Sequence, residues 1–285
     1  MSGRIALVTG GAAGIGRLLA CELARRGAVP VVWDLHEAKV TAVTDELQRL
    51  SRGRARGYVC DVTDADAVYE LAGRVRAEVG DPAVVVNNAG VVSGAPLLEI
   101  DDTDIRRTFE VNTLALFWVT KAFLPAMIRD DRGHVVTVAS AAGLVGVARQ
   151  TDFAASKHAA VGFDESLRVE LRRLAPGVTT TVVCPYYVDT GMFAGVRTRV
   201  PFLLPILKPN DVARRIADAI AEDRRMLVLP PVVRLLPALR LLPPPVFDRV
   251  MDVLGINVSM EHFVGHPRPA PGASGVPGPP DREQH

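Results

Sequence analysis

The sequence is poor in cysteine, in aromatic residues and in net charge. Its three cysteines, Cys21, Cys60 and Cys184, lie far apart in apolar or strand-like segments and form no CxxC pair. We therefore expect buried, reduced thiols, which are typical of a reducing compartment. Aromatic residues make up 5% of the 285-residue chain, and the net charge is +1. No basic run is interrupted by aromatics, so nucleic acid is not expected as a partner.

Long apolar runs are also missing. The run at 4–8 is too short for a signal peptide, and no apolar run reaches the roughly 18 residues that a membrane-spanning helix needs. The histidines follow no zinc-ligand spacing, so no metal site is expected. These observations favour a cytoplasmic protein, with one reservation about the C-terminal region.

Seven short aliphatic or β-branched runs alternate with segments of helical periodicity. We expect strands at 4–8, 29–33, 57–60, 83–86, 134–138, 179–183 and 226–229, and helices near 14–26, 36–51, 64–79, 103–130, 153–174 and 210–222. The strands lack an in–out polar alternation, as expected for a parallel sheet that is covered on both faces. Right-handed crossovers then give a single α/β domain of the Rossmann type, doubly wound, with about seven parallel strands.

A glycine cluster follows the first expected strand and begins the first expected helix. Residues 9–16 read Thr-Gly-Gly-Ala-Ala-Gly-Ile-Gly. Glycines permit a tight turn and let the backbone approach a pyrophosphate, and the helix N-terminus offers unpaired N–H groups and a positive dipole end. We therefore predict a dinucleotide site that includes Gly10, Gly14, Ile15 and Gly16.

Asp34 bears on the choice of dinucleotide, because it ends the second expected strand, 18 residues beyond Gly16. A carboxylate there can accept hydrogen bonds from both hydroxyls of the adenine ribose, and it would repel a 2′-phosphate. Ala13 supplies no basic side chain for such a phosphate, although Arg17 is close by. The pattern favours NAD over NADP.

The residues that would move a proton form an incomplete set. Phe153 lies 13 residues after Ser140 and four residues before Lys157. A serine, a tyrosine and a lysine at this spacing would make a site for alcohol–carbonyl chemistry. An ammonium one helical turn away lowers the phenol pKa from about 10 toward neutrality. Here the ring is present and the hydroxyl is missing.

Together, these motifs resemble those of the short-chain dehydrogenase/reductase family over roughly residues 3–230. Besides the glycine loop, Ser140 and Lys157, the resemblance rests on Asp61-Val62, Asn87-Asn88-Ala89-Gly90, Asn112 and Cys184-Pro185 through Thr190. A weaker resemblance, to the retinol and hydroxysteroid dehydrogenase branch, rests on the sequence at 188–193 and on the apolar C-terminal segment.

The resemblance implies cofactor contacts from three further loops. Asp61 and Val62 would contact the adenine, and Val188 and Thr190 would hold the carboxamide of the nicotinamide. The cofactor ribose would lie against a third loop, formed by Asn88, Ala89 and Gly90.

The resemblance also implies a catalytic set of Asn112, Ser140, position 153 and Lys157. Asn112 would anchor a water in a proton relay, and Ser140 would hydrogen-bond the substrate oxygen. Lys157 would bind the nicotinamide ribose and lower the pKa of a tyrosine at 153. Phe153 can neither donate nor accept that proton, and general acid–base catalysis typically contributes about 10²–10⁴-fold. We expect an intact NAD site and a severely slowed chemical step.

Two functions from different classes fit this pattern. One is an oxidoreductase that interconverts a lipophilic secondary alcohol and its ketone, favoured by the apolar stretches 192–207 and 227–247. The other is a catalytically silent NAD-binding protein that acts by association. In a less favoured third case, Tyr186, where the family usually has glycine, would replace the missing hydroxyl. A natural loss and an engineered substitution at 153 both fit the sequence.

Composition divides the chain into three parts. We assign 1–230 to the NAD-binding catalytic domain, 231–266 to an apolar, proline-rich extension and 267–285 to a disordered tail. The stretch 227–247 forms short helices over the substrate cleft or, in the alternative, touches a membrane surface peripherally, with Arg234 and Arg240 at the headgroups.

Self-association is a further expectation. The expected helices 103–130 and 153–174 carry apolar residues on more than one face. With the family resemblance, this implies a homodimer or homotetramer.

Overall fold

A computed structural model of the chain describes residues 1–264, and the tail predicted for 267–285 lies outside them. Seven parallel strands form one sheet in the order β3-β2-β1-β4-β5-β6-β7. They are β1 (Ile5–Thr9), β2 (Val29–Asp34), β3 (Arg56–Val59), β4 (Val84–Asn87), β5 (Gly133–Val138), β6 (Val178–Pro185) and β7 (Met226–Leu229). The predicted doubly wound fold is confirmed, and every strand begins within one residue of its expected start.

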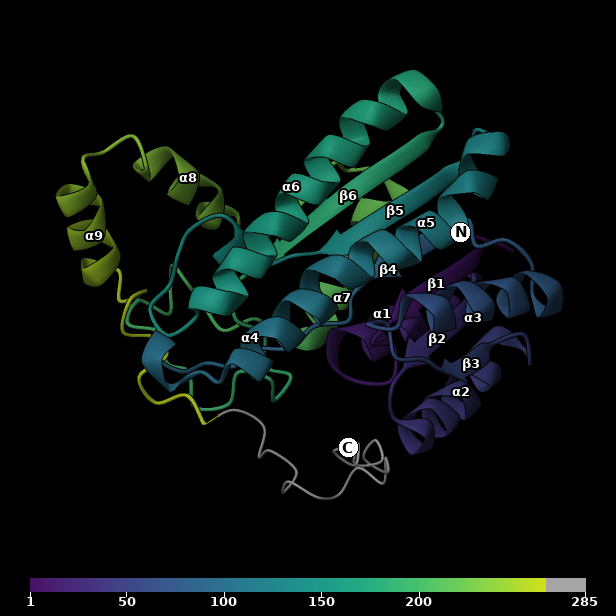
Figure 1. The fold of residues 1–285 in the computed structure, drawn as a ribbon, viewed down its shortest axis with the longest axis horizontal. Helices are drawn as coiled ribbons and strands as arrows, with labels where there is room; N and C mark the ends of the chain where they lie inside the picture. The colour runs from purple at the N-terminus through teal and green to yellow at the C-terminus, as the bar shows by residue number, and fades with distance from the viewer. Residues whose placement is uncertain (265–285) are drawn as a thin grey trace, which may run out of the picture.

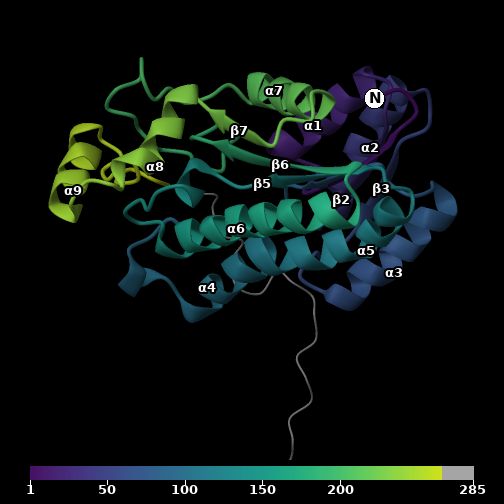
Figure 2. The ribbon, with the colours of Figure 1, turned by 90° about the horizontal axis from the view of Figure 1, so that it is seen from above.

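Helices cover both faces of the sheet (Figures 1 and 2). One layer holds α1 (Gly14–Arg25), α2 (Glu37–Ser51) and α7 (Pro209–Ala221), and the other holds α3 (Ala65–Glu78), α4 (Asp102–Phe109), α5 (Ala115–Arg129) and α6 (Thr151–Leu174). Successive residues of β1 serve both layers, since Ala6 and Val8 pack into the core on the α1 side and Leu7 packs on the α3 side. Burial on both faces is why the central strands β1 and β4 are almost wholly apolar.

The strand order reverses between β1 and β4, which are neighbours in the sheet. The chain runs outward from β1 to β3 and then crosses back to begin the other half at β4. In open α/β sheets, the crevice beyond the carboxyl ends of the strands at such a reversal is where ligands bind. The topology therefore directs attention to the loops that follow β1 and β4.

The single helix expected at 103–130 is interrupted, which corrects that prediction. A π-helical turn, Glu110–Leu114, separates α4 from α5 and contains Asn112. The helical stretch Asp102–Arg129 is also long and apolar enough, by length and composition alone, to cross a membrane, contrary to our expectation. In this fold Val119 and Phe123 pack into the core on the α3 side of the sheet, which gives the apolar composition a structural use.

The extension after β7 forms short helices at the end of the molecule far from α2 and α3 (Figure 1). They are a 3₁₀ turn (Pro231–Leu235), α8 (Leu236–Leu239) and α9 (Pro244–Val253), and two further 3₁₀ turns lie at Leu97–Glu99 and Ala141–Gly143. Side chains on the inner side of the extension, including Val233 and Met251, are buried in one cluster with Tyr186 and Tyr187. Residues 227–229 are buried in β7, so this part of the suggested lipid-contact stretch is not at the surface.

Candidate active site

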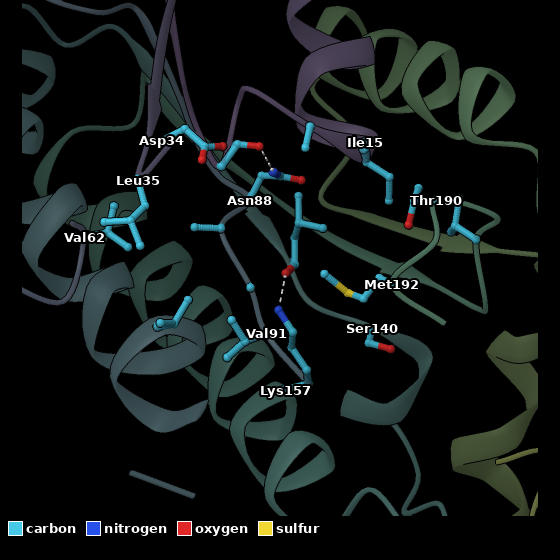
Figure 3. A pocket seen from close by; sticks show the side chains of 18 of the residues that line it. Ile15, Asp34, Leu35, Val62, Asn88, Val91, Ser140, Lys157, Thr190 and Met192 are labelled. Atoms are coloured by element: carbon cyan, nitrogen blue, oxygen red, sulfur yellow. Dashed lines mark hydrogen bonds between the residues drawn. The ribbon is translucent and has the colours of Figure 1, made fainter. Parts of the chain in front are cut away.

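Loops at the carboxyl ends of the central strands surround one cavity of about 330 Å³. It lies at the reversal of strand order. Most of the site residues predicted from the sequence line it: Gly10, Gly14, Ile15, Asp34, Asp61, Val62, Asn88, Ala89, Gly90, Ser140, Phe153, Lys157, Val188 and Thr190. Of the predicted set, Gly16 and Asn112 lie behind the cavity wall. Figure 3 shows Asp34, Leu35 and Val62 at one end, with Ser140 and Lys157 at the other.

The loop between β1 and α1 has room only for glycine at key positions. Gly10 has a φ of 60°, in the left-handed region. A Cβ at Gly16 would lie 2.2 Å from the carbonyl oxygen of Gly10 and 2.5 Å from Nδ2 of Asn88. No side chain caps the N-terminus of α1, so its first N–H groups stay available to an anion. The loop therefore fits a dinucleotide pyrophosphate.

Thr9 joins this loop to the strand β4. Its Oγ1 accepts hydrogen bonds from the backbone N–H groups of Asn88, at 3.0 Å, and Ala89, at 3.1 Å. In return, Asn88 Nδ2 donates to the carbonyl oxygens of Thr9, at 2.9 Å, and Gly10, at 3.1 Å. The two sides of the crevice are thus held together before any ligand binds.

Asp34 lies at the end of β2 with its carboxylate over the glycine loop. The N–H of Ala12 donates to its Oδ2 at 3.1 Å, which orients the group toward the cavity. Arg17, the one nearby base considered from the sequence, forms an ion pair with Glu46 on α2 at 2.7 Å. Leu35 and His36, which follow Asp34, also line this end. A carboxylate positioned in this way suits a ribose diol.

Asn112 is fully buried at the π-helical turn. Its Oδ1 accepts from the N–H of Val91 at 2.8 Å, and its Nδ2 donates to the carbonyl oxygen of Val91 and to Ser156 Oγ. Both amide hydrogens are therefore engaged within the protein. Only a second lone pair of Oδ1 is left for the water relay that the resemblance implied, and the observed contacts make Asn112 a brace for the chain after β4.

The opposite end of the cavity holds Ser140 and Lys157. Ser140 Oγ accepts from the N–H of Ala142 at 3.1 Å and lies 3.5 Å from the carbonyl oxygen of Pro185. Lys157 Nζ donates to the carbonyl oxygen of Val138 at 2.9 Å. Burial lowers the pKa of Lys157 from 10.5 to about 8. The Ser140 hydroxyl and the Lys157 amine, whose pKa is shifted toward neutrality, therefore border the same cavity.

Phe153 lies on the first turn of α6 and lines the same cavity. Its ring centroid is 5.8 Å from Lys157 Nζ, and 3% of the residue is exposed. Phe193, in the loop after β6, meets the ring edge to face at 5.8 Å and also contacts the ring of Tyr187. The ring of Phe153 therefore packs as a member of an aromatic cluster.

Tyr186 lines the same cavity and is buried. Burial raises the pKa of its phenol above the usual value of 10, so the hydroxyl keeps its proton at neutral pH. The ring packs against Tyr187, at a centroid distance of 4.6 Å. These contacts suit a residue that walls the cavity.

The C-terminal chain joins the loops after β4 and β6. The N–H of Val264 donates to the carbonyl oxygen of Ala194 at 3.0 Å, and the N–H of Arg197 donates to that of Ser259 at 3.2 Å. Phe263 packs directly on Gly94, where a Cβ would lie 2.0 Å from its ring. We call residues 259–264 the C-terminal strap.

Sequence reasoning did not identify several lining residues. Trp33, Cys60 and Val91 each adjoin a predicted residue at a strand end, so the strand pattern could have found them. Arg107 on α4 and Val111 in the π-helical turn lie about one turn apart and line the cavity, and no motif signals them. Within residues 1–264, no group of three or more His, Cys, Asp or Glu side chains could hold a metal ion.

Comparison with known proteins agrees with this geometry. The short chain dehydrogenase profile matches residues 4–201. Epidermal retinol dehydrogenase 2 of Mus musculus is 41% identical over 271 residues, which are 93% of this chain and 86% of that protein. Retinol dehydrogenase 10 of Xenopus tropicalis is 40% identical over 301 residues, covering 95% of this chain and 87% of that protein.

Solved structures give the same result. A short-chain dehydrogenase/reductase from Burkholderia phymatum in complex with NAD superposes with a TM-score of 0.76 at 29% identity, over 84% of this chain and 93% of that one. A metagenomic short-chain oxidoreductase in complex with NADP gives 0.66 at 30% identity, over 80% and 95%. The chain has an oxidoreductase scaffold and belongs, as its motifs indicated, to the short-chain dehydrogenase/reductase family.

Proposed function

We propose that this protein is an NAD-dependent oxidoreductase that interconverts a lipophilic secondary alcohol and its ketone, with a chemical step slowed by Phe153. The observation that carries the proposal is the single cavity that joins a glycine loop and Asp34 to Ser140 and Lys157. Cofactor and substrate sites must be continuous for hydride transfer, because the hydride passes directly between two bound carbons.

The cradle fits a nicotinamide dinucleotide. Its pyrophosphate would lie on the N-terminus of α1, and its adenine ribose would hydrogen-bond to Asp34. Asp61 and Val62 would border the adenine, while Val188 and Thr190 would meet the carboxamide. Family members are crystallised with either NAD or NADP. The carboxylate of Asp34 and the engagement of Arg17 by Glu46 support NAD for this chain.

When bound, the dinucleotide supplies or accepts the hydride, and the residues of this chain must manage the substrate oxygen. The hydroxyl of Ser140 would donate to that oxygen and hold it in place. The roles proposed for Ser140 and Lys157 do not require a tyrosine at 153, because none of the three hydrogen bonds that they make in the protein involves residue 153. What is lost is the phenol as a proton donor and acceptor.

The substrate class is supported by the walls around Ser140. Val91, Tyr186, Met192 and Phe193 surround this end with apolar surface. Two named relatives are retinol dehydrogenases, and retinol is a long apolar alcohol. Burial of such a chain in an apolar pocket is favourable by about 25 cal/mol per Å². Because retinol is a primary alcohol, a substrate panel should contain both primary and secondary apolar alcohols.

The competing function is a silent NAD-binding protein that acts by association. Position 153 separates the two. If Phe153→Tyr raises turnover of an apolar alcohol by about a hundredfold or more, the scaffold is an enzyme that lacks one hydroxyl. If calorimetry shows NAD binding and the Tyr variant stays inert over the panel, the silent protein is favoured. Absence of heat with oxidised and reduced dinucleotide would refute both.

Peripheral lipid contact through residues 235–246 is proposed as a second property. The segment exposes Leu235, Leu241, at 90%, and Val246, and Arg240 is exposed near His158, with Nη2 at 2.9 Å from its Nε2. Apolar side chains flanked by arginine suit the boundary of an anionic bilayer. Co-sedimentation with anionic vesicles tests this, and Leu241→Asp should release the protein. If Leu241→Asp leaves co-sedimentation unchanged, the proposed lipid contact is refuted.

Self-association is proposed through α5 and α6. Phe117 on α5 and Val169 on α6 stay exposed, as does Leu114 directly before α5, and the ring centroids of Phe117 and Phe163 lie 4.9 Å apart. A homodimer or homotetramer would cover this surface. Light scattering after gel filtration gives the mass, and Phe117→Glu should produce a monomer. Together with a cytoplasmic location, these two properties remain predictions.

A further inference from the structure

Lys157 is unlike the other lysines of the chain. There are four, Lys39, Lys121, Lys157 and Lys208, and the other three are exposed. Lys157 is 5% exposed and has its amine on the wall of the cavity. A buried ammonium is costly unless a fixed anion accompanies it, and where none does, the group tends to lose its proton.

The surroundings of Nζ supply little compensation for its charge. It donates to one backbone carbonyl, that of Val138. The group whose charge would favour the ammonium is Cys184 on β6, but burial raises the pKa of that thiol to about 12. Cys184 is therefore neutral at physiological pH. Tyr186 beyond it is also neutral, and Asp164, two turns along α6, has its pKa raised to about 7 by burial.

Lys157 lines the same cavity as Ser140 and Phe153. A Cβ at Gly90 would lie 3.6 Å from Nζ, so no side chain from that position of the loop crowds the amine. On the other side, the ring of Phe153 has no hydroxyl to take a proton from it or give one to it.

We propose that Lys157 is itself the general acid and base of this chain, exchanging with the substrate oxygen the proton that a tyrosine would exchange. The proposal rests on the proposed function. In ketone reduction with the reduced dinucleotide, the carbonyl carbon gains a hydride. One Nζ–H bond of Lys157 breaks as an O–H bond forms on the substrate. The neutral amine then regains a proton from solvent, and alcohol oxidation is the reverse.

Two physical arguments favour Lys157 over Tyr186 for this role. A catalytic acid works best when its pKa lies near the operating pH, and the pKa of Lys157 is lowered to about 8. Burial raises the pKa of Tyr186 instead, so its phenol is a weaker acid than in water. At neutral pH it also lacks the phenolate form that could act as a base. Burial thus brings only the amine toward neutrality.

The first test measures the lysine directly in the protein without ligand. With ¹³C label at the lysine Cε, four resonances are expected, and Lys157→Arg identifies one by its loss. We expect that resonance to titrate near pH 8 and the other three near the usual value of about 10.4. If the Lys157 resonance titrates with the exposed lysines, the proposal is overturned.

The second test is kinetic. Reduction of apolar ketones by the unchanged protein should lose rate as the pH rises through about 8, because the ammonium is the acid. Lys157→Arg keeps the charge but holds its proton over the whole range. We expect its kcat to fall by about tenfold or more, while calorimetry still detects dinucleotide binding. Lys121→Arg, an exposed matched control, should leave both quantities unchanged.

A third variant guards against misfolding of the arginine protein. Lys157→Ala opens a space that small primary amines can enter, and we expect added methylamine to restore part of the rate. If Phe153→Tyr is active while the unchanged protein shows neither the pH break nor a response to Lys157→Arg, the role of Lys157 is refuted and the proposed function stands. If Phe153→Tyr is inert as well, both are refuted.

Discussion

The two ends of the cavity differ in how much of their task is already built into the protein. At the dinucleotide end, hydrogen bonds among Thr9, Asn88, Ala12 and Asp34 hold the crevice together without a ligand. At the substrate end, Ser140 and Lys157 line the cavity together with Phe153, whose ring carries no hydroxyl. Under the proposed function, the first end has all its binding groups in place and the second lacks the phenol of a tyrosine.

The difference shows that binding and chemistry depend on different kinds of feature. Dinucleotide binding relies on backbone shape spread over several loops, so many substitutions would damage it. Under the proposed function, proton transfer relies on one functional group, whereas the ring at position 153 also packs against Phe193. A protein can therefore lose rate at one position while it keeps fold and cofactor affinity.

The largest effect is expected at the substrate end. In a Phe153→Tyr background, Ser140→Ala should lower kcat by about 10²–10³-fold, because it removes a donor aimed at the reacting oxygen. Steady-state kinetics with an apolar alcohol measure this. Dinucleotide affinity should hardly change. Equal losses in kcat and in affinity would mean that the two ends are not separable.

At the dinucleotide end we expect a smaller effect, which is a loss of affinity for NAD. Gly16→Ala places a Cβ 2.2 Å from the carbonyl oxygen of Gly10 and should weaken NAD binding by about 10–100-fold, the equivalent of a 1–3 kcal/mol overpacking cost. Gly73→Ala, in the interior of α3, is the matched control and should have no effect. Isothermal calorimetry gives both values. Normal affinity in the Gly16 variant would contradict the proposed phosphate loop.

A smaller effect is expected on the preference for NAD over NADP. Asp34→Ala combined with Ala13→Arg removes the carboxylate and adds a base, so preference should move from NAD toward NADP by about tenfold or more. Fluorescence titration with both reduced dinucleotides measures the ratio. An unchanged ratio would refute the role assigned to Asp34.

The smallest effect on dinucleotide binding and on catalysis is expected from a change at Asp164, which lies on α6 and packs against the sheet. Burial raises its pKa from 3.8 to about 7, and Thr180 Oγ1 donates to its Oδ2. The unfolded chain releases this proton near pH 4 and the folded one near pH 7. Stability therefore falls as the pH rises between these values, by at most about 4 kcal/mol, and is flat above.

Asp164→Asn should remove that part of the pH dependence. Urea unfolding at pH 5 and pH 8 compares the variant with the unchanged protein and with Asp66→Asn, which alters an exposed carboxylate on α3. NAD affinity should stay the same in all three. An identical pH profile for the Asp164 and Asp66 variants would show that the buried carboxyl does not control stability.

The sequence predicted the sheet well because every buried parallel strand is a short apolar run bounded by loop residues. It also found the cavity, since its motifs sit at strand ends that topology brings together. It did not find the π-helical turn at Asn112, because one inserted residue hardly alters helical periodicity. Arg107 and the contact between Phe263 and Gly94 escaped notice because they depend on tertiary packing between distant segments.

The C-terminal strap bears on how a ligand enters and leaves the cavity. Because it is hydrogen-bonded to the loop after β6 and its Phe263 packs on Gly94 after β4, neither loop can swing outward alone. A bulky substrate that spreads the two loops must also break the contacts of residues 259–264. We therefore expect the rates of substrate entry and product release to depend on the C-terminal strap.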